Sequence, residues 1–145
     1  VHKWLSTKNL ITQNIDGLDG KAGNKTYIPI HGRLDKVTKF VEQGVITPEI
    51  DAPWREIEGL GFDHEENDKD EDSLAEALLS FFKIKKQRDG KYLPERNISF
   101  KPFVLLFDEY YTDLYRINEA QRRMLLAEKM VFIGTSFSVN ITSMA

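Results

Sequence analysis

The stretch NLITQNIDGL, residues 9–18, decides how the fold of this 145-residue chain is interpreted. It begins with an apolar run and then passes directly into a cluster of amides and a carboxylate, followed by glycine. In open α/β sheets, polar side chains that gather beyond the carboxyl end of a strand form the ligand site. The stretch therefore predicts a strand over Leu10–Thr12 that leads into a binding loop. The alternative is that Asn14, Asp16 and Gly17 only build a turn after the strand.

Three more apolar runs predict further strands. Tyr27–Ile30 contains a proline, which is typical of a strand end or a sheet edge. Phe103–Phe107 and Met130–Ile133 are continuous apolar runs, as in parallel strands buried on both faces. Between the last two, Asp113 can cap a helix, and the order strand, helix, strand predicts a right-handed βαβ unit. The expected apolar face of that helix comprises Leu114, Ile117, Ala120, Met124 and Leu125.

The sequence between the predicted strands has a different character. Residues 35–62 contain two prolines and three glycines with poor periodicity, so we expect loop with short helical turns. Ser73–Glu76 has the composition of a capping box and predicts a helix that continues to about Gln87 and ends in a turn at Asp89–Gly90. The expected apolar face of this helix comprises Leu74, Ala77, Leu78, Phe81 and Phe82.

An acidic block lies just before that helix, with seven carboxylates among residues 63–72. Such a block is typical of a solvated loop. A calcium loop is excluded by spacing because, counted from Asp68, the position that requires glycine is Ser73 and the position that requires glutamate is Leu79.

Composition narrows the classes of protein. Apolar residues at 41% and charged residues at 30% are typical of a globular protein of one-domain size. No apolar run approaches the roughly 18 residues of a membrane span, and basic patches interleaved with aromatics are missing, so we expect neither membrane nor nucleic acid as a partner. The absence of cysteine excludes thiolate metal sites and fits a cytoplasmic protein. We expect no metal.

Three motifs resemble those of the sirtuins, the NAD-dependent protein deacylases, in the family's order. TQNIDGL, residues 12–18, with His31–Gly32 after it, resembles the nicotinamide-handling motif and catalytic histidine. KPFVLLFDE, residues 101–109, resembles the sirtuin RPxVVxFGE segment, and GTSFSV, residues 134–139, resembles GTSxxV.

The resemblance implies an α/β fold: a partial Rossmann-like parallel sheet with a helical, zinc-free small-subdomain insertion over 35–100, within a partial sirtuin-like catalytic domain over 1–145. Most sirtuins hold a structural zinc in that subdomain with two cysteine pairs, which this chain cannot supply. Nothing here matches the glycine-rich GAGxSxxSGIPDFR segment. We therefore expect a central fragment of the catalytic domain that is inactive by itself.

The resemblance also assigns site residues, with NAD as the cofactor. It makes His31 and Asn14 catalytic, and it places Ile15 and Asp16 around nicotinamide and Gln13 near the ribose. The physical chemistry agrees, since a carboxylate can accept from the carboxamide NH₂ and imidazole titrates nearest neutrality. The remaining cofactor-binding positions are Gly134, Thr135 and Ser136. His2 and His64 match nothing and are expected at the surface.

Two departures from the family pattern bear on the substrate. Phe107, Asp108 and Glu109 match the segment that binds the acyl-lysine peptide, but Asp108 replaces a glycine that lets the peptide pair with backbone. Asp19 replaces a usual histidine. The tyrosines at 110 and 111 are equally consistent with core and with channel wall.

The function implied by the resemblance is deacylation of an acylated lysine protein. An acyl-lysine oxygen attacks the ribose carbon as nicotinamide leaves, His31 activates a ribose hydroxyl, and the acyl group ends on ADP-ribose. Two alternatives remain open. One is an NAD glycohydrolase or ADP-ribosyltransferase, and the other is a non-catalytic module that binds NAD or ADP-ribose.

Overall fold

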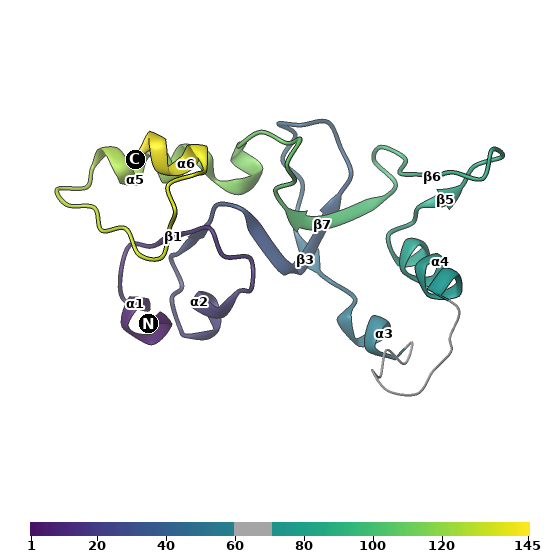
Figure 1. Cartoon of the computed structure of the whole chain (residues 1–145), viewed down its shortest axis with the longest axis horizontal. Helices are drawn as coiled ribbons and strands as arrows, with labels where there is room; N and C mark the ends of the chain where they lie inside the picture. Colours follow the sequence, from purple (N-terminus) through teal and green to yellow (C-terminus); the bar gives the residue numbers. More distant parts are fainter. Residues whose placement is uncertain (60–70) are drawn as a thin grey trace. The chain divides into compact units, whose positions relative to one another are not determined.

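The computed structural model describes residues 1–59 and 71–145 (Figure 1), apart from the side chains of Glu71 and Leu74. Contacts divide the chain into two compact units. Unit 1 joins Val1–Gly32 to Leu105–Ala145, and unit 2 is Arg33–Val104. The predicted acidic loop falls mainly on residues outside the described ranges.

Unit 1 contains the parallel strand pair that the sequence predicts. The elements at its start are α1 (His2–Leu5), β1 (Ile11–Thr12), α2 (Leu18–Lys21) and β2 (Ile28–Pro29). Strands β1 and β2 run parallel, with Ile11 opposite Ile28 and Thr12 opposite Pro29. The ladder donors are the amides of Ile28 and Ile30, at 2.9 and 3.0 Å from their acceptors. Pro29 lies between these donors, so its missing N–H removes no ladder bond.

The core of unit 1 forms where helices of the second half meet this strand pair. These helices are η1 (Asp113–Tyr115), α5 (Ile117–Leu125) and α6 (Asn140–Met144). The predicted cap at Asp113 is wrong in position, because Arg116 adopts φ 59°, separates η1 from α5 and is the N-cap of α5. The Asp113 carboxylate nevertheless accepts from a first-turn amide of α5, that of Asn118, at 3.0 Å. Leu125 was predicted to be on the buried face, but 85% of it is exposed. The buried cluster comprises Ile28, Ile30, Ile117, Ala120 and Ile141.

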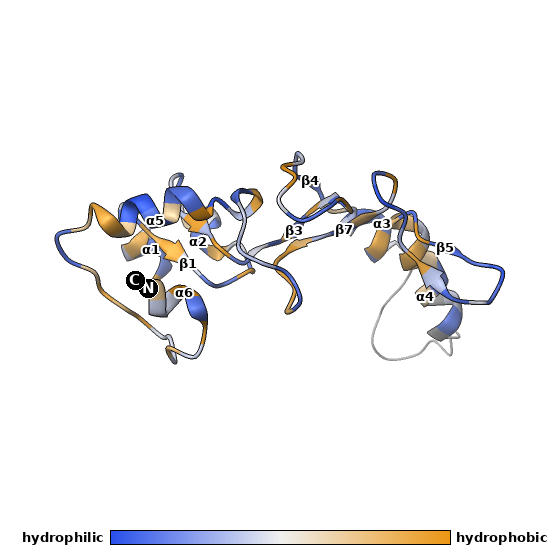
Figure 2. Cartoon of the chain, turned by 90° about the horizontal axis from the view of Figure 1, so that it is seen from above, coloured by the Kyte–Doolittle hydropathy of each residue, from blue (hydrophilic) through white to orange (hydrophobic). Residues whose placement is uncertain are grey.

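The predicted strand over Met130–Ile133 does not form. Within the described ranges these residues pair with no strand, and their side chains are 43–80% exposed. Figure 2 shows the segment after α5 as two hydrophobic stretches separated by a hydrophilic one. An apolar run becomes a strand only where a neighbour satisfies its backbone groups, so the predicted βαβ unit is wrong for this structure.

Unit 2 contains a three-stranded sheet in the order β4, β3, β7. Its strands are β3 (Gly32–Lys39), β4 (Ile50–Asp51) and β7 (Phe100–Val104). The pairing of β3 with β4 is antiparallel. The expectation of loop over 35–62 is therefore wrong for β3, although α3 (Trp54–Glu58) is one of the short helical turns expected there. The strand predicted at Phe103–Phe107 begins and ends three residues earlier.

The helix predicted from the capping box is shorter and begins earlier. Helix α4 spans Glu71–Phe81, so Ser73 lies inside it and does not cap it. It stops well before Gln87 because Lys83 adopts a left-handed conformation, with φ 53°, which cannot continue a right-handed helix. Strands β5 (Lys85–Lys86) and β6 (Tyr92–Leu93) follow as an antiparallel pair. The predicted turn at 89–90 exists, but it joins these strands.

Candidate functional site

His31 lies at the carboxyl edge of the β1–β2 pair. Because these strands are parallel, the residues after both strands meet at one edge. Gln13 directly follows β1, and His31 comes two residues after β2. The Nδ1 atom of His31 is 3.2 Å from the backbone carbonyl oxygen of Gln13. The structure therefore brings together the histidine and the loop that the sequence singled out.

The other ring nitrogen of His31 contacts Tyr111. Its Nε2 atom is 2.7 Å from the Tyr111 hydroxyl oxygen. The two rings are stacked, with centroids 5.8 Å apart and planes inclined by 28°. A carbonyl oxygen only accepts, so Nδ1 must carry the proton in the bond to Gln13. In the neutral ring Nε2 is then a lone pair that accepts from the Tyr111 O–H.

The surroundings favour the neutral form of His31. Burial lowers the pKa of His31 below its ordinary value, and the hydrogen bond to the Gln13 carbonyl opposes this shift in part. Burial also raises the pKa of Tyr111, so its hydroxyl keeps its proton and remains a donor. A neutral imidazole with its lone pair at Nε2 is the state that a general base requires.

The loop after Gln13 combines both interpretations of the sequence. The Asp16 carboxylate accepts from the amide of Leu18 through Oδ1, at 2.9 Å, and thus does build the turn into α2. Gly17 adopts φ 69° in that turn. The side chains of Asn14 and Asp16 are nevertheless exposed. They remain accessible to a ligand at the edge that carries His31.

The predicted peptide-binding segment is partly used by the fold itself. The Glu109 carboxylate accepts from the amide of Leu106 at 3.0 Å and from the hydroxyl of Tyr115 at 3.3 Å. Glu109 therefore closes its own turn. Phe107 and Asp108 in that turn are exposed.

The segment predicted to contact the ribose forms a separate turn. Gly134 adopts φ 65° and is exposed. The Thr135 hydroxyl accepts from the amide of Phe137 at 3.3 Å, and the hydroxyls of Ser136 and Ser138 are 2.6 Å apart. The side-chain hydrogen bonds of residues 134–136 thus stay local, and none joins them to His31 in the described part of the chain.

Two contacts were missed from the sequence. Tyr111 belongs both to the site, through His31, and to the core, against which it packs. Its only signal was its place in the pair of tyrosines after the FDE triplet. Asp19 is buried and lies 2.8 Å from Nδ1 of His2. His2 was expected at the surface, but it is half-buried and pairs with the aspartate that departs from the family pattern.

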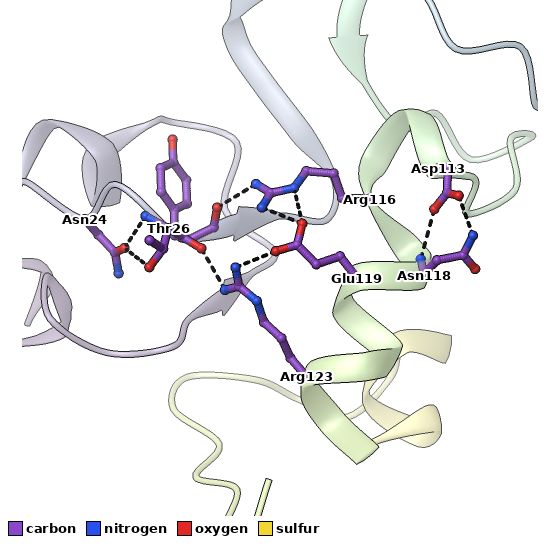
Figure 3. A network of polar contacts seen from close by, with 8 residues as sticks. Asn24, Thr26, Asp113, Arg116, Asn118, Glu119 and Arg123 are labelled. Atoms are coloured by element: carbon purple, nitrogen blue, oxygen red, sulfur yellow. Dashed lines mark hydrogen bonds and ion pairs between the residues drawn. The ribbon is translucent and has the colours of Figure 1, made fainter. Parts of the chain in front are cut away.

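A polar network fixes α5 to the segment that enters β2 (Figure 3). Arg116 donates to the carbonyl of Tyr27 at 3.1 Å, and Arg123 donates to that of Thr26 at 2.7 Å. Glu119 accepts from both arginines, at 2.8 Å from Arg116 Nε and 2.6 Å from Arg123 Nη2. Because His31 closely follows β2, this network helps to hold the histidine against the helical half of unit 1.

Residues 1–59 and 71–145 offer neither a metal centre nor a membrane span. No group of three or more His, Asp or Glu side chains is arranged to hold a metal ion there. No helix in the same ranges is long and apolar enough to cross a membrane.

Comparisons with known proteins agree on one family. The model of the Sir2 family matches residues 2–141. A Sir2 homologue, a point mutant in complex with ADP-ribose, is 19% identical over 99% of this chain and 47% of its own, with a TM-score of 0.56. Sir2Af2 bound to a myristoylated histone peptide is 22% identical over 99% of this chain and 51% of its own, with a TM-score of 0.55. No curated protein matches.

The chain thus spans about half the length of the solved structures that it matches. At these identities the likeness concerns the fold. It confirms the predicted α/β class with a partial Rossmann-like parallel sheet.

Proposed function

This chain belongs to the Sir2 family, the sirtuins, whose cosubstrate is NAD, and we propose that it carries the general base of a protein-lysine deacylase. The proposed activity couples nicotinamide release to acyl transfer onto ADP-ribose. The observation that carries the proposal is the arrangement of His31. Its Nδ1 bonds to the carbonyl of Gln13, the residue before the exposed Asn14, and its lone pair therefore lies at Nε2.

The hydrogen-bonding groups of the loop next to His31 fit the nicotinamide and ribose end of NAD. Within the described contacts the Asp16 carboxylate uses Oδ1 in its turn, which leaves Oδ2 to accept from the carboxamide NH₂. Asn14 offers an exposed amide to a ribose hydroxyl or an ordered water, and Ile15 and Gln13 flank it. At Gly134 no heavy atom outside its neighbours in the chain lies within 4 Å of the position that a Cβ would occupy, so the backbone there is open to a ligand. We extend the cofactor site to Thr135 and Ser136 on the family motif.

The protein's part in the reaction follows from the proton on His31. When bound, NAD supplies an electrophilic ribose carbon and nicotinamide as the leaving group. His31 accepts the proton of a ribose hydroxyl at Nε2. The imidazolium that results keeps its Nδ1–H on the Gln13 carbonyl, so one of its two donors is already satisfied. Asn14 and Asp16 orient the ribose and the carboxamide.

The acyl-lysine peptide is proposed to lie along Phe107 and Asp108, which are exposed. Glu109 supports this segment through its bonds to Leu106 and Tyr115. The compact unit Arg33–Val104 supports the assignment of residues 35–100 as the small-subdomain insertion.

A second candidate is an NAD glycohydrolase or ADP-ribosyltransferase. It is favoured by Asp108, whose exposed carboxylate stands where the family motif has glycine. That carboxylate alters the charge of the peptide path and leaves the nicotinamide end unchanged.

The test is to incubate the full-length protein with NAD, with and without an acylated lysine peptide, and to measure nicotinamide. The same peptide with an unmodified lysine is the matched control. Release that depends on the acyl group supports the deacylase. Release that is equal with both peptides supports the second candidate, and no release in any mixture contradicts both.

A further inference from the structure

In the described part of the chain, the side chain that hydrogen-bonds to the catalytic nitrogen of His31 is that of Tyr111. We propose that Tyr111 is a positioning residue that fixes the orientation of the His31 ring, while the Gln13 carbonyl selects its tautomer. The inference rests on the proposed function, in which Nε2 is the basic atom.

The argument begins with the two ends of the imidazole. Nδ1 bonds to the Gln13 carbonyl at 3.2 Å, and Nε2 bonds to the Tyr111 hydroxyl at 2.7 Å. A half-turn of the ring about its bond to Cβ would put carbon atoms where both nitrogens now lie. Both hydrogen bonds therefore select one ring orientation, and the bond to a carbonyl, which only accepts, selects the tautomer with hydrogen on Nδ1.

Tyr111 is itself held independently of His31. It is half-buried and packs against the cluster that contains Ile28, Ile30 and Ile117. Its ring also stacks on the imidazole, with an angle of 28° between the planes. Because the Tyr111 ring is held by the core, its hydroxyl offers the Nε2 atom of His31 a hydrogen-bond partner at a fixed position.

The consequence for catalysis concerns which hydroxyl is hydrogen-bonded to Nε2. Before substrate binds, the Tyr111 O–H holds the lone pair toward the site. A ribose hydroxyl then takes its place and gives its proton to Nε2, while the hydrogen on Nδ1 stays with Gln13. Loss of the Tyr111 hydroxyl leaves only the Gln13 bond to hold the ring, and in the turned ring a carbon atom takes the place of the basic nitrogen.

The experiment reads the tautomer and the orientation of the His31 ring by NMR in the full-length protein labelled with ¹³C,¹⁵N-histidine, from the ¹⁵N shifts of the ring nitrogens and the nuclear Overhauser effects of the two ring C–H protons. The His31 signal is identified by its absence in His31→Gln. Tyr111→Phe removes only the hydroxyl and keeps the stacked ring. The matched control is Tyr110→Phe, which removes a hydroxyl from the neighbouring tyrosine, itself 77% exposed. Steady-state kinetics of the same proteins give kcat and KM for NAD separately.

We expect the wild type to hold His31 almost wholly in the Nδ1–H tautomer. In Tyr111→Phe the ratio of the two ring orientations should shift about fivefold toward the turned ring, the effect of one hydrogen bond between neutral groups. The value of kcat should fall while KM for NAD stays unchanged, and Tyr110→Phe should change neither.

The proposal is overturned if the wild type already carries hydrogen on Nε2, a result that does not depend on the folding of any variant. It is equally overturned if Tyr111→Phe leaves the ratio of ring orientations as it was, or if Tyr110→Phe shifts that ratio as much. The NMR result stands whether or not the protein releases nicotinamide, so a failure of the proposed function is seen separately.

Discussion

Two apolar residues of helix α5 should differ sharply in their effect on stability. Ile117 and Leu125 were both predicted to be on the buried face, but they are 8% and 85% exposed. Ile117→Ala removes three buried carbons, worth about 0.8 kcal/mol each, and leaves a cavity in the cluster with Ile28 and Ile141. We expect a loss of about 2–4 kcal/mol in the free energy of unfolding. Leu125→Ala should cost less than about 0.5 kcal/mol, as at other exposed positions.

The assay is equilibrium unfolding in urea of the 145-residue chain and both variants. The slope of the free energy with urea should be the same for all three proteins, so that the midpoints report stability alone. Both substitutions place alanine in the same helix, and helix propensity therefore favours neither wild type strongly. If Leu125→Ala lost as much free energy of unfolding as Ile117→Ala or more, Leu125 would be buried, as the sequence predicted, and the packing described above would be wrong.

Three further outcomes are expected. Burial holds the pKa of His31 below about 6.5, so the unfolded chain binds this proton at a higher pH than the folded chain. The free energy of unfolding should therefore keep its full value above pH 6.5 and decrease as the pH drops through the pKa of the folded chain. His31→Gln should lose this part of the pH dependence in urea unfolding, and an unchanged profile would contradict the shift. Calorimetry should show weak NAD binding by the 145-residue chain, since the helix after the turn at Gly17, α2, has only 4 residues and offers a pyrophosphate little helix dipole; micromolar affinity would refute this. Elemental analysis should find no stoichiometric zinc because the chain has no cysteine, and one zinc per chain would overturn that expectation.

Features set by neighbouring residues were predictable from the sequence. The strand at Leu10–Thr12 and the run at Tyr27–Ile30 follow from short patterns, and both strands are found in nearly those places. The turn at Asp89–Gly90 is equally local and exists, although it joins β5 to β6.

Features set by distant residues were not predictable. Met130–Ile133 has the composition of a strand, but composition does not supply a partner. The contact between His31 and Tyr111 joins residues 80 positions apart, and no local pattern indicates it. The early end of helix α4 depends on the backbone of Lys83, because lysine is not a residue that usually marks a left-handed position.

The central claim is that His31 is the general base, and its replacement in the full-length protein tests this most directly. The variant His31→Ala, with His2→Ala as the matched control, is assayed for acyl-dependent nicotinamide release and for NAD binding. Removal of a general base typically costs about 10²–10⁴-fold in rate, and a base contributes little to the affinity for the ground state. We predict a loss of that size for His31→Ala with NAD binding largely retained. Near-normal turnover by His31→Ala would remove His31 from the reaction and contradict the account.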